Sequence, residues 1–338
     1  MKKADDFFYD TLYFGGGSPS LMNSHILREL KGFLNEFIEE DSEISIEVNP
    51  EDIDEEKVLC WKELDINRIS IGIQGTDKNI LRKVNRKQSN LGKKLDMIFP
   101  HFDNINFDFI LGLPGENESN LKGNLNLIKE YRPTHVSYYI YDNDHDSPLN
   151  ALIGNGEVEL PSDEKIADYH DEIVRELFDM GFNRYEISSW SKKGFECKHN
   201  LRYWKNYDYI GLGPSAGGHC NNSRYVNIEN FEKYKNAIDK KQIPIDEFKN
   251  NNQIDELFEV LFMGFRLIEG INFEKYRFNR ELIQLVVEMI HKSMFEYVVE
   301  ENSFFRLNNH GFDHSHWFFC KLMDIYEEVI AENGEKFG

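Results

Sequence analysis

The sequence predicts an α/β protein in which a parallel sheet is followed by a small helical domain with a wing. Two observations predict the sheet: short apolar strands alternate with segments of helical periodicity, and short loops join them. A third observation predicts the second domain, because the pattern becomes almost wholly helical after about Asn230. The sheet is either open and doubly wound or closed into a barrel.

The first strand is expected at Thr11–Phe14, and a helix is expected at His25–Glu39. The helix is predicted from apolar residues at helical spacing, namely Ile26, Leu27, Leu30, Phe33, Leu34, Phe37 and Ile38. A glycine-rich turn lies between the two segments. This order is that of a βα unit, the repeating element of a parallel sheet.

Further strands and helices continue this alternation. The expected strands are Ile44–Val48, Arg68–Ile73, Asn106–Leu111, Val136–Tyr141 and Tyr185–Ser188. The most evident helices between them are Asp77–Arg86, Ser119–Tyr131 and Asp163–Met180. Loops that bind ligands should therefore lie at the carboxyl ends of the strands, as they do in barrels of this kind.

The C-terminal domain is predicted from helical periodicity and one hairpin. Its elements are helices at Ile254–Ile268, Arg280–Phe295 and His316–Ile330, and a hairpin around Phe304–Leu307. The segment Ile243–Ile245 contains a proline and is a candidate boundary. We therefore expect a first domain at residues 1–230 and a second at residues 231–338.

Composition excludes several classes of protein. The 60 acidic residues outnumber the 39 basic ones, which gives a net charge of −21 and disfavours nucleic-acid partners. The sequence contains no leader-like N-terminus and no run of about 20 apolar residues that could span a membrane. A cytoplasmic location is expected. Only four cysteines occur, too far apart for a disulfide framework, so free thiols are expected.

Polar residues and glycines gather at predicted strand ends. The turn Gly15–Ser20 follows the first strand, and its glycines would let backbone groups approach a ligand closely. Glu47, Gln74 and Asp108 lie at the ends of three later strands, so they should meet at one mouth of the sheet. Each could instead cap a helix, and the turn could serve only as a connection.

These segments together resemble one family. The match comprises Phe14–Ser20, Glu47–Pro50, Arg68–Gln74, Val84–Arg86, Asp108–Pro114, Tyr185–Ser188 and Gly264–Ile271. Their order and spacing resemble those of the radical S-adenosylmethionine (SAM) proteins related to oxygen-independent coproporphyrinogen III oxidase. The resemblance implies a partial (βα)6-type radical SAM barrel that lacks its first βα unit, followed by a winged-helix-like C-terminal domain.

The resemblance also implies a SAM pocket. Its residues would be Gly16, Gly17, Ser18, Glu47, Gln74, Arg86, Asp108 and the backbone at about Asp142. Carboxylates and amides suit the ribose hydroxyls and the ammonium group of SAM, and an arginine suits its carboxylate. Arg86 could instead be a surface charge of a helix.

A second motif is Cys197–Trp204, in which His-Asn-x-x-Tyr-Trp resembles the haem-binding element of HemW-type haem chaperones. The resemblance assigns haem binding to His199, Asn200, Tyr203 and Trp204, with His199 as the ligand of the iron. An imidazole is a good axial ligand, and aromatic rings can face a porphyrin. Without the family, His199 would be an ordinary hydrogen-bonded loop histidine.

Two further groups contain potential metal ligands. They are His310, His314 and His316 with Cys320, and Cys197 and His199 with His219 and Cys220. Imidazoles and thiolates bind zinc, but neither group has zinc-finger spacing. Solvated polar residues are the simpler expectation for the first group.

The family carries a C-x-x-x-C-x-x-C loop that binds a 4Fe-4S cluster, and this sequence contains no such motif. The chain is expected to be either an incomplete piece of a longer protein or a relative that has lost the chemistry. The leading function is a haem chaperone that delivers haem to an acceptor protein, with a membrane-associated acceptor left open. The alternatives are an oxygen-independent coproporphyrinogen III oxidase and a non-catalytic remnant. Neither the acceptor nor the oligomeric state can be read from the sequence.

Overall fold

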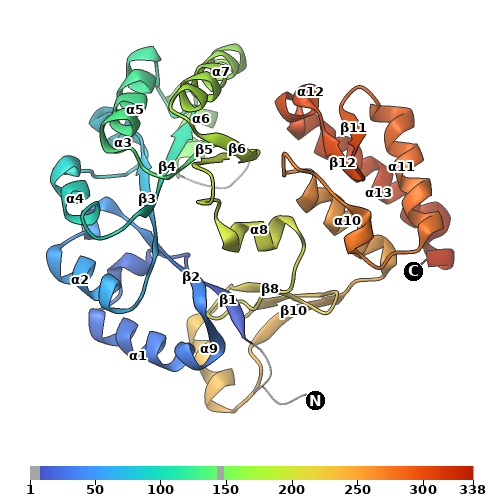
Figure 1. The fold of residues 1–338 in the computed structure, drawn as a ribbon, viewed down its shortest axis with the longest axis horizontal. Helices are drawn as coiled ribbons and strands as arrows, with labels where there is room; N and C mark the ends of the chain where they lie inside the picture. Colours follow the sequence, from blue (N-terminus) through green and yellow to red (C-terminus); the bar gives the residue numbers. More distant parts are fainter. Residues whose placement is uncertain (1–7, 143–147, 338) are drawn as a thin grey trace. The chain divides into compact units, whose positions relative to one another are not determined.

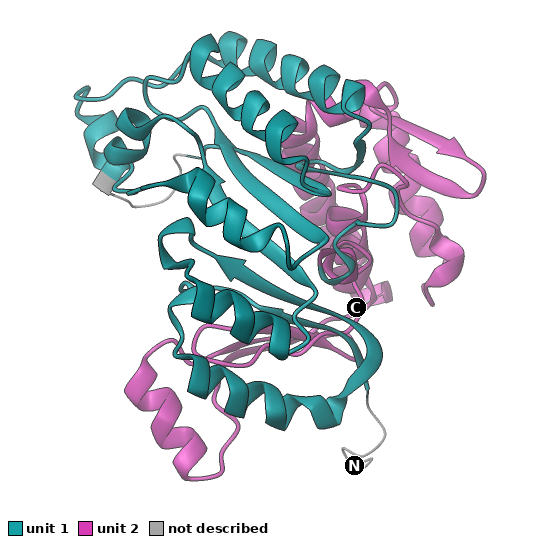
Figure 2. Ribbon diagram, turned by 60° about the vertical axis from the view of Figure 1, so that its left-hand side comes forward, with its two compact units in different colours: residues 1–199 teal, residues 200–338 magenta. Residues whose placement is uncertain are grey.

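The computed structural model describes residues 8–142 and 148–337. The chain forms two compact units, Met1–His199 and Asn200–Gly338 (Figure 2). The predicted boundary after residue 230 differs from this division for a physical reason. Strand β9 (Ser223–Asn227) pairs with β10 (Ile245–Asn250), so residues on both sides of position 230 belong to one sheet.

Unit 1 is built on a curved seven-stranded sheet with the order β1-β2-β3-β4-β5-β7-β6 (Figure 1). Its strands are β1 (Tyr9–Phe14), β2 (Ile38–Val48), β3 (Arg68–Gln74), β4 (Asn104–Leu111), β5 (His135–Ile140), β6 (Asn183–Glu186) and β7 (Ser189–Ser191). Strands β1 to β5 pair in parallel. Their carboxyl ends therefore share one edge, as the sequence predicts.

Helices connect the strands and cover the convex side of this sheet (Figure 1). Unit 1 contains α1 (Ser24–Leu34), α2 (Glu55–Glu63), α3 (Lys78–Lys83), α4 (Leu91–Ile98), α5 (Glu118–Tyr131), α6 (Pro148–Gly154) and α7 (Asp163–Asp179), with short 3-10 turns at Pro19–Leu21, Asn35–Phe37 and Pro50–Asp52. Most begin at a polar side chain that accepts a hydrogen bond from the first turn; the N-caps are Asn23, Asp54, Asp77, Asn117 and Ser162.

The two faces of the sheet differ in chemistry. Alternate residues such as Ile46, Ile71 and Phe107 are fully buried and form the hydrophobic core beneath the helices. Side chains alternate between the faces along a strand, so their neighbours point to the concave side. Asn106 and His135 are such neighbours, and they are polar and buried. The concave face is thus where the fold gathers its polar groups.

Two predicted elements of unit 1 differ from the structure. The helix expected at His25–Glu39 ends at Leu34, and Ile38 instead begins β2, where it pairs with Tyr9. The strand expected at Tyr185–Ser188 is part of an antiparallel hairpin formed by β6 and β7. β7 inserts between β5 and β6 because it pairs antiparallel with both of them.

Unit 2 follows within helix α8 (Lys198–Trp204), since the division falls after His199. Its strands form an antiparallel sheet of β8 (Gly217–Cys220), β9 and β10, and a hairpin of β11 (Val298–Glu301) and β12 (Phe304–Leu307). Its helices are α9 (Phe231–Asp239), α10 (Gln253–Gly264), α11 (Arg280–Met294), α12 (Asn309–Asp313) and α13 (Ser315–Phe337), with a 3-10 turn at Phe273–Lys275.

The helices and the hairpin predicted for this unit are present, whereas the three-stranded sheet was not predicted. No described helix is both long and apolar enough to cross a bilayer.

Candidate functional site

The glycine turn after β1 is exposed and built from left-handed backbone. Gly16, Gly17 and Ser18 have φ values of 70°, 50° and 70°. Residues other than glycine rarely adopt this left-handed backbone conformation, which explains why positions 16 and 17 are glycines. No atom lies within 4 Å of the Cβ position of either glycine, so the space beside their backbone is open. An open, side-chain-free backbone segment suits the close approach of a polar ligand.

Glu47 connects this turn with the first strand. Its Oε2 accepts a hydrogen bond from the backbone N–H of Gly16 at 3.1 Å, and its Oε1 accepts one from the hydroxyl of Tyr13 at 2.9 Å. A carboxylate offers about four lone-pair sites, so it can accept further donors. The structure therefore brings together two of the residues that the sequence analysis assigned to SAM.

Gln74 lies at the end of β3, whereas Asp108 lies inside β4, three residues before the strand ends at Leu111, and not at the strand end where it was expected. Gln74 is the last residue of β3 and has a φ of 63°, and its Nε2 lies 3.0 Å from where a Cβ of Gly72 would stand. Gly72 is opposite Asp108 in the register of β3 and β4. Gly72 therefore makes room for the Gln74 amide close to Asp108.

Arg86 and Asp142 lie on exposed loops, after α3 and β5 respectively. The backbone N–H of Arg86 donates to the carbonyl of Leu81 at 2.8 Å, which closes the end of α3. Their assignment to SAM stays a prediction that rests on the family resemblance.

A hydrogen-bond network, not predicted from the sequence, covers the concave face next to Asp108. Asp108 accepts from the Ser70 hydroxyl and from the Asn106 amide, both at 2.7 Å. Asn106 Oδ1 lies 2.6 Å from Nδ1 of His135, whose Nε2 lies 2.8 Å from the hydroxyl of Tyr185. The network therefore runs across β3, β4, β5 and β6.

Burial controls the charge of this network. It raises the pKa of Asp108, although the hydrogen bonds from Ser70 and Asn106 act in the opposite direction. Burial, and then the positive charge of Arg68, hold the pKa of His135 well below its ordinary value. His135 is therefore a neutral imidazole that bridges Asn106 and Tyr185. The signal in the sequence was the alternation of polar residues within apolar strands.

His199 lies at the start of α8 and is held by strand β1. Its Nδ1 lies 2.9 Å from the hydroxyl oxygen of Thr11, and its ring stacks on Tyr13 with centroids 4.9 Å apart and planes 14° from parallel. Thr11 and Tyr13 are two residues apart, so both side chains leave the same face of β1. The predicted haem ligand thus has its ring orientation fixed by two side chains.

Glu43 of β2 anchors the start of the same helix. Its carboxylate accepts from the backbone N–H groups of Lys198 and His199, each at 3.0 Å, and Cys197 Sγ lies 3.6 Å away. An anion at this end also complements the helix dipole. Glu43 is only 5% exposed, yet none of the motifs in the sequence pointed to it, because it is more than 150 residues from the helix it caps.

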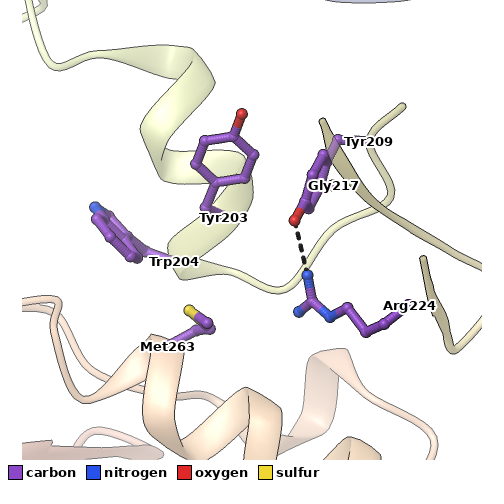
Figure 3. Close-up of a pocket in the computed structure, with 6 residues that line it drawn as sticks. All are labelled: Tyr203, Trp204, Tyr209, Gly217, Arg224 and Met263. Atoms are coloured by element: carbon purple, nitrogen blue, oxygen red, sulfur yellow. Dashed lines mark hydrogen bonds between the residues drawn. The ribbon is translucent and has the colours of Figure 1, made fainter. Parts of the chain in front are cut away.

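The predicted aromatic residues lie further along α8, in unit 2. Tyr203 and Trp204 line a pocket of about 320 Å³ together with Tyr209, Gly217, Arg224 and Met263 (Figure 3). Tyr203 and Tyr209 meet edge to face at 4.6 Å. The volume is at the lower end of small-molecule pockets, which span about 300–1,000 Å³. Asn200 is half-buried at the beginning of this unit.

Arg224 supplies the charge in this pocket. It donates to Glu259 at 2.8 Å, to the Tyr209 hydroxyl at 2.9 Å and to Asn206 at 2.6 Å. The pocket wall therefore combines aromatic faces and a thioether with one cation whose position is fixed by three partners. Such a lining suits a flat, largely apolar molecule with an acidic edge.

The structure identifies one group of possible metal ligands within the described residues, His219, Glu256 and Glu259. It is not either of the groups considered from the sequence. Hydrogen bonds already engage these carboxylates: Glu256 accepts from Asn206 at 2.7 Å and from Asn251 at 3.0 Å, and Glu259 pairs with Arg224. This arrangement is better explained as a buried polar network that ties α10 to β8 and β9.

The four cysteines do not fit a three-thiolate cluster site. Cys60 and Cys197 are buried, Cys220 is half-buried and Cys320 is exposed, and the last two belong to unit 2. Their sequence spacing has no C-x-x-x-C-x-x-C element. The residues of this chain therefore provide no set of thiolates for a 4Fe-4S cluster.

Comparison with known proteins agrees with this architecture. The radical SAM superfamily model matches residues 1–128. The fold is similar to that of coproporphyrinogen III oxidase (HemN) from Escherichia coli, described as a radical SAM enzyme, with a TM-score of 0.78 over 94% of this chain and 78% of that chain. Sequence identity in that comparison is 19%, so it speaks for the fold alone.

Two relatives with higher sequence identity than this oxidase are both named heme chaperone HemW. The heme chaperone HemW of Bacillus subtilis is 29% identical over 272 residues, which cover 79% of this chain and 72% of the relative. The heme chaperone HemW of Lactococcus lactis is 32% identical over 274 residues, or 79% of this chain and 71% of the relative. At that identity and coverage, the chain belongs to the HemW-type family of radical SAM proteins.

Proposed function

We propose that this protein binds haem through His199 and the aromatic residues of α8, and delivers it to an acceptor protein. The observation that carries the proposal is the fixed imidazole at the start of a helix whose end lines an aromatic pocket. A metal-bound histidine commonly uses its second ring nitrogen for an orienting hydrogen bond. The contact between Nδ1 and Thr11 is of this kind in the tautomer that protonates Nδ1, and in that tautomer Nε2 would be the nitrogen that binds the iron.

The relatives support the same function. The HemW proteins of Bacillus subtilis and Lactococcus lactis are named heme chaperones. In this chain, the faces of Tyr203 and Trp204 would contact part of the porphyrin.

We also propose that the glycine turn binds SAM. The open backbone at Gly16 and Gly17 and the carboxylate of Glu47 support this, because the methionyl end of SAM carries an ammonium group that needs an anionic acceptor. When bound, SAM would contribute the sulfonium group that its family uses for radical chemistry. The residues of this chain would hold its amino-acid end.

A haem titration followed at the Soret band tests the main proposal. His199→Ala should weaken binding at least about tenfold and shift the band, because it removes an axial bond, while far-ultraviolet circular dichroism stays that of the parent. His25→Ala and His314→Ala are matched controls, since both histidines are exposed and distant from α8 in the sequence. If His199→Ala titrates like the parent, haem binding by His199 is ruled out.

Delivery to an acceptor is tested by the rate of transfer. Haem-loaded protein is mixed with increasing amounts of a haem-free b-type cytochrome. Direct delivery predicts a transfer rate that rises with acceptor concentration, because the donor and acceptor must form a complex. A rate independent of the acceptor would mean that haem is simply released, which would contradict a chaperone function.

A further inference from the structure

The hydroxyl and the ring of Tyr13 contact two different candidate sites. Its ring stacks on the imidazole of His199, and its hydroxyl donates to Glu47, which also accepts from the backbone of Gly16. One side chain therefore lies between the proposed haem ligand and the proposed SAM turn. All of these residues belong to unit 1, so their contacts are internal to a single compact body.

Gly15 provides a second observation for this arrangement. A Cβ at Gly15 would lie 2.6 Å from the ring of Tyr13 and 3.1 Å from Oε1 of Glu47. Gly15 itself does not have the left-handed backbone of the two glycines that follow it. Its missing side chain is thus required by the close packing of Tyr13 and Glu47 against the turn.

The Tyr13 hydroxyl is neutral and so remains a hydrogen-bond donor to Glu47. Burial, followed by the negative charge of Glu47, raises the pKa of Tyr13 above its ordinary value. The hydroxyl therefore stays protonated across the physiological range and keeps donating to Glu47. The position of Glu47 consequently influences that of the Tyr13 ring.

We propose that Tyr13 is a positioning residue that couples a ligand at the glycine turn to haem coordination by His199. This inference rests on the proposed function. The ligand would be an amino-acid zwitterion, represented by the methionyl end of SAM, whose ammonium group pairs with Glu47. Pairing would restrict Glu47, and through it Tyr13 and the imidazole, so the ligand strengthens haem binding. By linkage, haem strengthens binding of the ligand by the same factor.

The test compares haem affinity of the full chain with and without saturating SAM. Allosteric coupling commonly changes affinity by about 5- to 150-fold, and we expect SAM to lower the haem dissociation constant of the parent at least about fivefold. Tyr13→Phe keeps the ring and removes the bond to Glu47, so the ratio of the two constants should fall to about one. Because the ratio is measured, a change in affinity without SAM does not affect the result.

Two further variants give the comparison its controls. Tyr131→Phe removes a hydroxyl that contacts Asp96 and the carbonyl of Gly92, so the ratio should stay that of the parent. Thr11→Val removes the partner of Nδ1 and should weaken haem binding about tenfold with and without SAM, as loss of an orienting partner does at metal sites. Calorimetry checks that the parent and Tyr13→Phe both bind SAM.

The outcomes separate this inference from the proposed function. If His199→Ala abolishes the haem response but SAM leaves the affinity of the parent unchanged, the coupling is refuted and haem binding stands. Retention of the full ratio in Tyr13→Phe also refutes the coupling. A parent that binds no SAM contradicts the proposed SAM site, and the coupling with it. If haem binding itself does not depend on His199, the proposed function is what fails.

Discussion

The two faces of the seven-stranded sheet are stabilised by different interactions, although the same strands contribute to both. On the convex face, Ile46, Ile71 and Phe107 are fully buried against the helices. On the concave face, Ser70, Asn106 and His135 are equally enclosed but are joined by hydrogen bonds. The convex face gains stability from apolar area, whereas a buried polar group on the concave face costs stability when its hydrogen-bond partner is removed. Substitutions at adjacent residues of one strand should therefore lower the free energy of unfolding by different amounts and for different physical reasons.

The largest expected effect is on the convex face. Phe107→Ala should lower the free energy of unfolding by about 3–5 kcal/mol, because it leaves a cavity in a core that cannot fully close. Urea unfolding, followed by circular dichroism, measures the loss. The folded fraction should still bind haem as the parent does. A loss below about 1 kcal/mol would mean that the core under the helices is loosely packed.

The neighbouring residue on the concave face should have a smaller effect with a different origin. Asn106→Ala removes the partner of Asp108 and His135, and burying unpaired groups should cost about 2–3 kcal/mol. Asn155→Ala, at an exposed site, should change stability by less than about 0.5 kcal/mol. The same urea experiment compares them. Equal values for the two variants would show that the network adds nothing to stability.

The smallest effect depends on pH and concerns Glu116, in the loop after β4. Burial raises its pKa to about 6, against the backbone hydrogen bond that it accepts from Gly112. The unfolded chain ionises this group near pH 4.5, so stability falls as pH rises from about 4.5 to 6 and the penalty persists above that range.

Glu116→Gln should therefore be more stable than the parent above pH 6, by at most about 2 kcal/mol, and equal to it near pH 4. The difference between the two unfolding curves isolates this group, since other titrating residues are shared. An advantage for the glutamine variant that grows as pH falls would have the wrong sign and would contradict a raised pKa.

Most of the sheet of unit 1 was predictable because β2 to β5 are short apolar segments between helical ones. The end of α1 was not, because Phe37 and Ile38 continue the helical spacing although Ile38 pairs with Tyr9 in the sheet. The sheet of unit 2 was missed for another reason. Strand β10 is largely exposed and polar, so it gives no apolar signal, and only its pairing with β9 defines it.

The site could be predicted only in part. Glu47 and His199 were identified through family motifs, and the structure adds the contacts that orient them. Thr11 and Glu43 were missed because they reach residues 188 and 156 positions away, which no local pattern can indicate. The alternation of polar residues in β3 to β5 did carry a signal, but it was interpreted only at the strand ends.

The shared acceptor in the concave network also restricts how this sequence can change over evolution. Oδ1 of Asn106 serves both His135 and Ser137, while its amide group serves Ser70 and Asp108. Replacing any one of them by an apolar residue removes at least one hydrogen bond from a partner in this network. Accepted changes at these positions should therefore occur in concert, through paired replacements that restore donors and acceptors, whereas Ile71 and Phe107 can drift singly among side chains of similar volume.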